Sequence, residues 1–451
     1  MSAKTPKKLD QLATLRAALE RRGSVRRAQR MVNSMHPAEI ASLLESLPPA
    51  KREIVWGFID PELEGDVLVE LNEQVRGDLM SGMDAEELIA ATENMEVDDL
   101  ADVIGDLPEA VNQQVLRSLD SQDRERLNAV LGYEQDSAGG LMNTDTVSVR
   151  PDVTLEVVLR YLRMRGELPD RTDRLFVVNR HDHYLGALDV TRLLTDDPDH
   201  TVAEVMDSSV AGISADTAAN EVTKLFENRD LVSAAVVAGD GKLLGRITVD
   251  DVVDVIREQA DHSVKSLANL QDEEDLFSAV IPSTRRRGVW LGINLLTAFL
   301  ASGVVAIFES TIDRVVALAV LMPIVASMGG IAGTQTVTLI VRGLALGQVN
   351  WSNTRWLLLK ELTVAALNGI VWAAVVGAYT MSIYGEWKLA GIIFAALIMN
   401  LLAAAIVGVT VPLMLKKLRV DPALASGVIL TTFTDCIGFA ALLGLGAIFL
   451  V

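Results

Sequence analysis

Apolar and polar positions divide the chain into two halves of different character. Up to about residue 285, apolar residues alternate with charged ones, whereas beyond it they form long uninterrupted runs. Each long run is sufficient to cross about 30 Å of hydrocarbon as a helix. The runs lie at roughly 288–309, 315–341, 357–384, 390–415 and 422–449. The second half is therefore predicted to be an α-helical membrane domain with five spans.

The first part of the N-terminal half repeats a pattern typical of short amphipathic helices. Between about residues 9 and 130, segments begin at an acid or a proline, carry Leu or Ile at i, i+3 and i+4, and then break. DAEELIAATENM and VDDLADVIGDLPEAVNQQVLRSL are two examples. Repeated hairpins of such helices predict an all-α superhelical domain.

Two later segments repeat each other at a constant offset of 59 residues. LFVVNRHDHYLGALDVTRLL spans 175–194 and AAVVAGDGKLLGRITVDDVVDVI spans 234–256, so that Gly186 corresponds to Gly245. Each segment predicts a β-hairpin followed by a helix. The repeat resembles a tandem pair of CBS domains, which are α/β regulatory modules and not catalysts. The resemblance implies binding of an adenine nucleotide such as ATP, although no residue here compels it.

These different sequence patterns predict a multi-domain protein. We expect a helical N-terminal domain, two CBS domains, a connecting helix and the five-helix membrane domain. The expected bounds are 1–135, 136–200, 201–257, 258–284 and 285–451.

Charge is distributed as unevenly as hydrophobicity. From Arg285 onward the chain has 11 Lys or Arg and 6 Asp or Glu, and the residues before it hold the other 29 and 54, a net of −25. So acidic a region repels itself and gains stability from bound cations. It lacks the basic footprint of a nucleic-acid-binding protein. Cys436 is the single cysteine, which excludes an intrachain disulfide and a thiolate zinc site.

The ends of the spans predict their orientation in the lipid bilayer. The N-terminus leads into polar helix without the apolar core of a signal peptide, so we expect the N-terminal domains in the cytosol. With that orientation, the Lys and Arg residues flanking the spans fall mostly on the inside, as the positive-inside rule requires. We therefore expect a multi-pass protein of the cell (inner) membrane. An odd number of spans then places its C-terminus on the outer side of that membrane.

Span five carries one carboxylate in the middle of its apolar run. In DPALASGVILTTFTDCIGF, residues 421–439, this acid is Asp435. A charge at that depth usually faces a bundle interior or a water-filled path. Helical spacing places four small or polar residues on the same face. The face is typical of a cation path, or alternatively of a helix-packing seam with a protonated Asp. The four residues are Gly427, Thr431, Thr432 and Gly438.

Span two contains a tract of small residues, PIVASMGGIAGTQTVTLIVRGLALG, residues 323–347. Its glycines either let a neighbouring helix approach closely or break the helix and expose carbonyls to a cation. Asn294, Asn368 and Asn400 in the other spans are predicted to form interhelical hydrogen bonds.

Acidic residues also recur at helical spacing in the N-terminal half. Asp98 and Asp102 lie four residues apart, and most such pairs are solvated surface. A longer stripe leads into the membrane domain, where its position favours a meeting with another acidic surface through metal ions. The stripe consists of Asp250, Asp254, Glu258 and Asp261.

The order of segments, together with the two tracts in spans two and five, resembles the MgtE family of magnesium channels and transporters. The resemblance implies a homodimer whose fifth spans line a pore on the two-fold axis. It implies that Mg²⁺ is both transported and regulatory. When Mg²⁺ binds the N-terminal domains, the connecting "plug" helices would close the pore.

The resemblance also implies roles for individual acids. Asp435 matches a pore carboxylate that holds hydrated magnesium, and Asp421 matches an acid at the inner mouth. Ile331 stands where the family commonly has Asn, which weakens any role for that side chain at the ion. Asp98 and Asp102 match magnesium ligands in the helical domain of the family. Asp250, Glu258 and Asp261 match acids of the family's second CBS domain and plug. Asp254 lies on the same acidic stripe but has no match in the family.

The residue chemistry bears on which functions are compatible. Mg²⁺ prefers oxygen ligands and keeps much of its water, whereas zinc and copper favour histidine and thiolate. A broader divalent cation transporter for Mn²⁺ or Co²⁺ is the main alternative, followed by a CBS-regulated membrane protein without ion flux. An acidic pore centre disfavours anions. An intramembrane aspartyl protease needs a second mid-depth acid, which we do not expect here.

Overall fold

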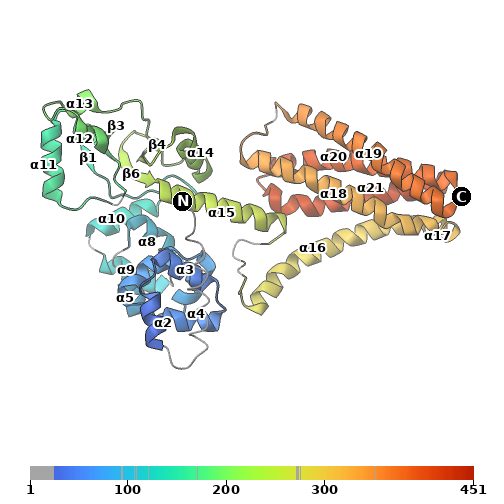
Figure 1. Ribbon diagram of the computed structural model, residues 1–451, viewed down its shortest axis with the longest axis horizontal. Helices are drawn as coiled ribbons and strands as arrows, with labels where there is room; N and C mark the ends of the chain where they lie inside the picture. The colour runs from blue at the N-terminus through green and yellow to red at the C-terminus, as the bar shows by residue number, and fades with distance from the viewer. Residues whose placement is uncertain are drawn as a thin grey trace. The chain divides into compact units, whose positions relative to one another are not determined.

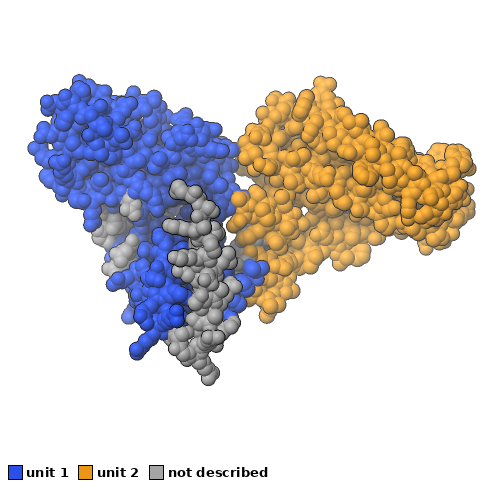
Figure 2. Space-filling view, viewed as in Figure 1, with its two compact units in different colours: residues 1–259, 275–277 blue, residues 260–274, 278–451 orange. Residues whose placement is uncertain are grey.

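The computed structural model describes residues 25–92, 95–105, 107, 109–119, 121–169, 171–270, 274, 276–350 and 352–451. The chain forms two compact units (Figure 2). Unit 1 comprises residues 1–259 and 275–277, and unit 2 comprises residues 260–274 and 278–451.

Short helices build the first part of unit 1, as the repeated pattern predicts (Figure 1). Prolines begin α3, α4 and α5, where the missing N–H costs nothing because the first turn has no intrahelical acceptor. The apolar faces of the short helices meet in one core that includes Ile40, Leu68 and Leu127. The helices are α2 (Val25–Val32), α3 (Pro37–Glu45), α4 (Pro49–Trp56), α5 (Pro61–Val69), α6 (Glu73–Met80), α7 (Ala85–Thr92), α8 (Val97–Ile104), α9 (Glu109–Ser118) and α10 (Ser121–Val130).

The two repeated segments form two matching three-stranded sheets, in the orders β1-β2-β3 and β4-β5-β6. In each sheet the first two strands are parallel and the last two form the predicted hairpin. The elements are β1 (Ser148–Val149), α11 (Leu155–Arg165), β2 (Arg174–Val178), β3 (Tyr184–Asp189), α12 (Val190–Thr195), α13 (Val202–Val205), β4 (Ile213–Ser214), α14 (Ala219–Arg229), β5 (Ser233–Val237) and β6 (Leu243–Thr248).

The two sheets are joined by a reciprocal exchange of backbone hydrogen bonds. Asn143, in the segment that opens the first repeat, pairs with Arg246 on β6 of the second. Asp207, in the corresponding segment of the second repeat, pairs with Ala187 on β3 of the first. The repeated glycines lie beside these bridges and leave room for the incoming backbone.

Unit 2 contains five helices long and apolar enough to span a membrane, as predicted. The most buried is α20, which packs against α18, α19 and α21 (Figure 1). In α16, by contrast, Ala301 is the one buried residue among those that the structure describes. The long helix α15 (Val249–Leu267) precedes them. The others are α16 (Val280–Ile307), α17 (Glu309–Arg314), α18 (Ala317–Ala345), α19 (Thr354–Tyr384), α20 (Trp387–Lys417) and α21 (Pro422–Phe449).

The connecting segment differs from the single helix expected over residues 258–284. It begins inside α15, which is continuous with the end of the second CBS repeat and stops at Leu267. The first span then begins as a helix at Val280, before the expected apolar run. Helical spacing could predict the acidic stripe on α15 but not the end of that helix.

The repeated glycine of the CBS pair gives the first prediction. A Cβ on Gly245 would lie 2.7 Å from the backbone oxygen of Asn143, so Gly245→Ala has to displace a backbone. We expect a loss of about 1–3 kcal/mol in stability, as for other overpacked positions. Gly239→Ala is the control, because its Cβ would meet no atom within 4 Å. Thermal unfolding of the full chain in detergent measures both, and equal midpoints would contradict the prediction.

Candidate functional site

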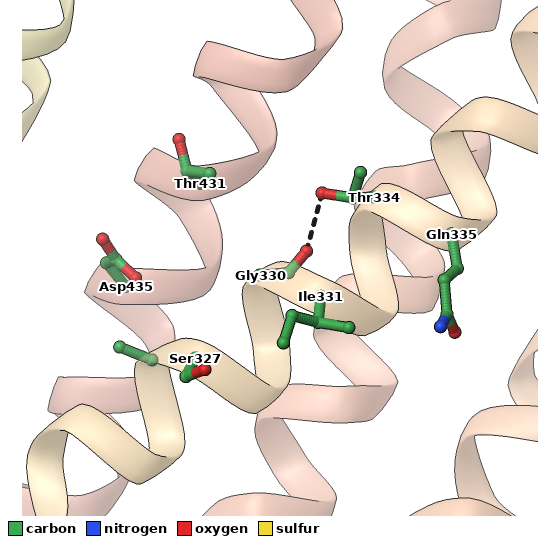
Figure 3. Close-up of a pocket in the computed structure, with 8 residues that line it drawn as sticks. Ser327, Gly330, Ile331, Thr334, Gln335, Thr431 and Asp435 are labelled. Carbon is green, nitrogen blue, oxygen red and sulfur yellow. Dashed lines mark hydrogen bonds between the residues drawn. The ribbon is translucent and has the colours of Figure 1, made fainter.

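Asp435 lies on α21 beside a hollow of about 510 Å³. Its carboxyl and the hydroxyl of Thr431, one turn earlier, project from the same side of the helix (Figure 3). Across the hollow, α18 contributes the other wall. Thr431 is exposed and Asp435 is half-buried. The lining residues are Ala326, Ser327, Gly330, Ile331, Thr334, Gln335, Thr431 and Asp435.

The threonine hydroxyls around the hollow donate their protons to their own helices. Thr431 donates to the Gly427 carbonyl at 3.1 Å, and Thr334 donates to the Gly330 carbonyl at 2.8 Å (Figure 3). The hydroxyl oxygens therefore keep lone pairs that can accept from water. The hollow thus offers acceptors, which suits the outward-pointing protons of a hydrated cation.

The small face of α21 predicted from the sequence divides into two parts. Gly427 lies two turns before Asp435, and a Cβ there would meet no atom within 4 Å. Gly438 is instead buried, and its Cβ would lie 2.8 Å from Asn400 Nδ2. Thr432 donates to the Val428 carbonyl at 2.7 Å and does not line the hollow. Gly438 therefore packs against Asn400, whereas Gly427, Thr431 and Asp435 lie on the open side of the helix.

Gly329, Gly330 and Gly333 of the span-two tract lie within the continuous helix α18, so they do not break the helix. A Cβ on Gly329 would lie 2.2 Å from Asn400 Nδ2, and one on Gly333 would lie 2.5 Å from Leu430. These two glycines permit close packing, whereas Gly330 lines the hollow. Ile331 lines it as well and is 57% exposed, which places an apolar side chain opposite the carboxylate.

Of the three predicted interhelical asparagines, Asn400 alone forms such a bond among the described residues. Its Nδ2 donates to the Val325 carbonyl on α18 at 2.8 Å. Asn294 instead donates to the Trp290 carbonyl of its own helix, and Asn368 is exposed. Sequence spacing placed all three in spans but could not tell which faced a neighbour.

Asp421 caps the N-terminus of α21, as its position before Pro422 predicts. One carboxylate oxygen accepts from the Ala423 N–H at 2.8 Å. The other, Oδ2, lies 3.4 Å from Nε2 of His262, which is on the part of α15 that belongs to unit 2. The end of α15 thus contacts the residue expected at the inner mouth.

Unit 1 brings several of the predicted acids close together. Burial raises the pKa of Glu258, and the nearby charges of Asp102, Asp254 and Asp136 raise it further, while Arg76 lowers it. Burial likewise raises the pKa of Asp254, although Arg257 opposes this. Asp102 on α8 and Glu258 on α15 are far apart in the sequence, so the fold creates their proximity.

The other predicted acids have different surroundings. Asp250 pairs with Arg171 and accepts from the Thr248 hydroxyl. Asp261 is exposed on α15, in the part of that helix within unit 2. Asp98 lies on α8, but its side chain is outside those that the structure describes.

Sequence reasoning missed two acids. Asp136 joins the group around Glu258, and only the fold reveals this. Glu361 is a buried acid on α19 that accepts from the Thr336 hydroxyl on α18 at 3.1 Å and pairs with Lys360 at 2.7 Å. The sequence does contain a signal for Glu361, because this acid lies inside the predicted third span, as Asp435 lies inside the fifth.

Comparisons with known proteins match nearly the whole chain. A family model described as a divalent cation transporter, MgtE, matches residues 322–445; the MgtE intracellular N domain matches 35–136, and CBS domains match 138–197 and 202–258. A protein of Thermus thermophilus named magnesium transporter MgtE is 30% identical over 443 residues, which is 97% of this chain and 98% of that protein. One of Bacillus subtilis with the same name is 25% identical and covers 98% of both chains.

Among solved structures, the chain is similar to a crystal structure of the cytosolic domain of the Mg²⁺ channel MgtE in complex with ATP. The identity is 30% and the TM-score is 0.49, with 54% of this chain and 99% of that chain covered.

Proposed function

Because this chain belongs to the MgtE family of divalent cation transporters, we propose that it carries Mg²⁺ across the membrane along a path centred on Asp435. The observation that carries this proposal is the hollow between α18 and α21, which the carboxylate of Asp435 and the hydroxyl-bearing residues Thr431 and Thr334 line together. The proposed substrate follows the name of the two magnesium transporters, with which this chain aligns over nearly its full length.

The carboxylate and hydroxyl groups in the lining, which includes no histidine or cysteine among the described residues, support a hydrated hard cation as cargo. Mg²⁺ releases its water reluctantly and is bound through one or two carboxylates. Asp435 supplies one such group per chain, and Thr431 can accept from the ion's water. Mn²⁺ and Co²⁺ share the charge and bind oxygen as well, so a broader divalent range is the second candidate.

We propose further that the transporter is a homodimer with α21 of each chain at the two-fold axis. The hollow opens to one side of the chain, and Thr431 is exposed on that side although it lies deep within a span. In a second copy related by a two-fold axis, the same residues of α21 would face those of the first copy. Two carboxylates would then face one ion.

The acids of unit 1 support a proposal for regulation by intracellular Mg²⁺, with the N-terminal domains in the cytosol. Like charges gathered around Glu258 are unfavourable without counter-ions. Divalent ions that bridge them would favour a compact state by binding it more strongly than an extended one. The path would close at high internal Mg²⁺, and Asp421, already in contact with α15, is where we place the gate.

ATP stays an expectation from the resemblance to CBS pairs. Among the described residues of the two repeats, none identifies a nucleotide site. Calorimetric titration of the full chain with ATP would test it separately from ion flux.

The first test of the path is Asp435→Asn, which keeps the side-chain volume and removes the charge. Hydrogen bonds to charged groups contribute about 1.5–3 kcal/mol, so Mg²⁺ uptake into liposomes should fall about tenfold or more. Asp313→Asn, an exposed acid on α17, is the control. Normal uptake by a correctly inserted Asp435→Asn protein would refute the assignment, and absence of flux in the unaltered protein would favour a membrane protein without transport.

A cysteine at Thr431 tests the dimer. In a Cys436→Ala background, Thr431→Cys should form an α21–α21 crosslink under mild oxidation, since both copies lie at the axis. Leu367→Cys, on an exposed face of α19, should not. An active reconstituted protein whose measured mass is that of one chain would exclude the dimer.

Neutralising the acids tests the gate. The combined variant Asp98→Asn, Asp102→Asn, Glu258→Gln and Asp261→Asn should keep its flux at internal Mg²⁺ concentrations that stop the unaltered protein. It should also lose the protection against proteolysis that Mg²⁺ gives to residues 260–284. A control that removes four exposed acids elsewhere, at Glu53, Glu62, Glu86 and Glu227, should behave normally. Closure by Mg²⁺ in both variants would show that these acids only solvate the surface.

A further inference from the structure

Asn400 is a polar residue in the middle of the most buried span, with no exposed surface. Its Nδ2 donates to the Val325 carbonyl on α18 at 2.8 Å. Because a carbonyl can only accept, the nitrogen side of the amide must face α18. The amide is therefore held in one orientation.

Two glycines on two other helices make room for this amide. A Cβ on Gly329 of α18 would lie 2.2 Å from Nδ2, and a Cβ on Gly438 of α21 would lie 2.8 Å from it. Both distances are far below van der Waals contact. Any side chain at either position therefore requires Asn400 or a helix to move, so the amide sets the spacing of α18 and α21.

The same two stretches of helix carry the walls of the hollow. Gly438 lies one turn after Asp435, and Val325 and Gly329 flank Ser327 on α18. A shift of α21 relative to α18 at Asn400 would therefore change the distance from the carboxylate to the opposite wall. We propose that Asn400 is a positioning residue, which fixes the geometry of the ion site without lining it; this inference rests on the proposed transport function.

The chemistry of Asn400 fits positioning better than space filling. Its Oδ1 is buried without a hydrogen-bond partner among the described residues. An unpaired buried acceptor is unfavourable, and an apolar residue of similar volume such as leucine would avoid it. The donor group is therefore the feature that the site uses. Leucine keeps a similar volume but has no donor, so it cannot replace the amide.

Uptake as a function of external Mg²⁺ is the first readout. Asn400→Leu and Gly438→Ala should each shift the half-maximal concentration severalfold, which a smaller amount of folded protein would not do. In the double variant Gly438→Ala with Asn400→Ala, the new methyl group occupies space left by the amide but no donor to Val325 remains, so the value should stay shifted. Gly391→Ala on α20, where a Cβ meets nothing within 4 Å, is the control.

Labelling of Cys436 gives a second readout that does not depend on transport. This free thiol is adjacent to Asp435 and is partly buried. Its rate of reaction with a small thiosulfonate should rise severalfold in Asn400→Leu and Gly438→Ala, and should stay raised in the double variant.

The two readouts separate this inference from the proposed function. If the unaltered protein moves no Mg²⁺ but the labelling rates change as described, the proposed function fails and the positioning of α21 stands. If Asn400→Leu matches the unaltered protein in both readouts, or if the double variant recovers in both, Asn400 only fills space and the inference is overturned.

Discussion

An ionised carboxylate in a hydrocarbon layer has to be paired or solvated, and this constraint organises the membrane half. Glu361 meets it by pairing, with Lys360 on its own helix and the Thr336 hydroxyl on α18. Asp435 has no ion pair within the described part of the chain and instead faces the hollow. Glu361 is therefore paired within the fold, whereas the carboxylate of Asp435 is free to bind a ligand that enters the hollow.

Helix α21 serves two partners because its small residues point in two directions. On one side, Gly438 and Gly446 receive Asn400 and Leu318 and let α21 pack closely on α20 and α18. On another, Gly427, Thr431 and Asp435 stay open. The sequence left a packing seam and a cation path as alternatives, and the same helix carries both a close-packed side and an open side. The close contact at Gly438 would hold the proposed path in place, because Gly438 lies one turn after Asp435.

Local patterns predicted much of the fold, and the failures concern contacts between distant residues. The repeat at an offset of 59 predicted both hairpins, and apolar length predicted the spans, since both depend on neighbouring residues. The face of Gly438 depends on Asn400, which lies on another helix, so helical spacing alone assigned it to the path. The proximity of Asp102, Asp136 and Glu258 likewise arises from folding. Glu361 was within reach of sequence reasoning, because it breaks an apolar run as Asp435 does.

The raised pKa of Glu258 shows why its surroundings suit a cation sensor. Its folded pKa lies above the unfolded value, so this group stabilises unit 1 at low pH and the contribution is lost as pH rises through the folded pKa. Above that pH, the ionised cluster repels itself, and a bound divalent cation removes the repulsion. Under the proposed regulation, protons and Mg²⁺ would compete for the same oxygens, and the repulsion left when both are absent would favour opening. An acid already paired with a lysine, as Glu361 is with Lys360, would have no repulsion for a divalent cation to relieve.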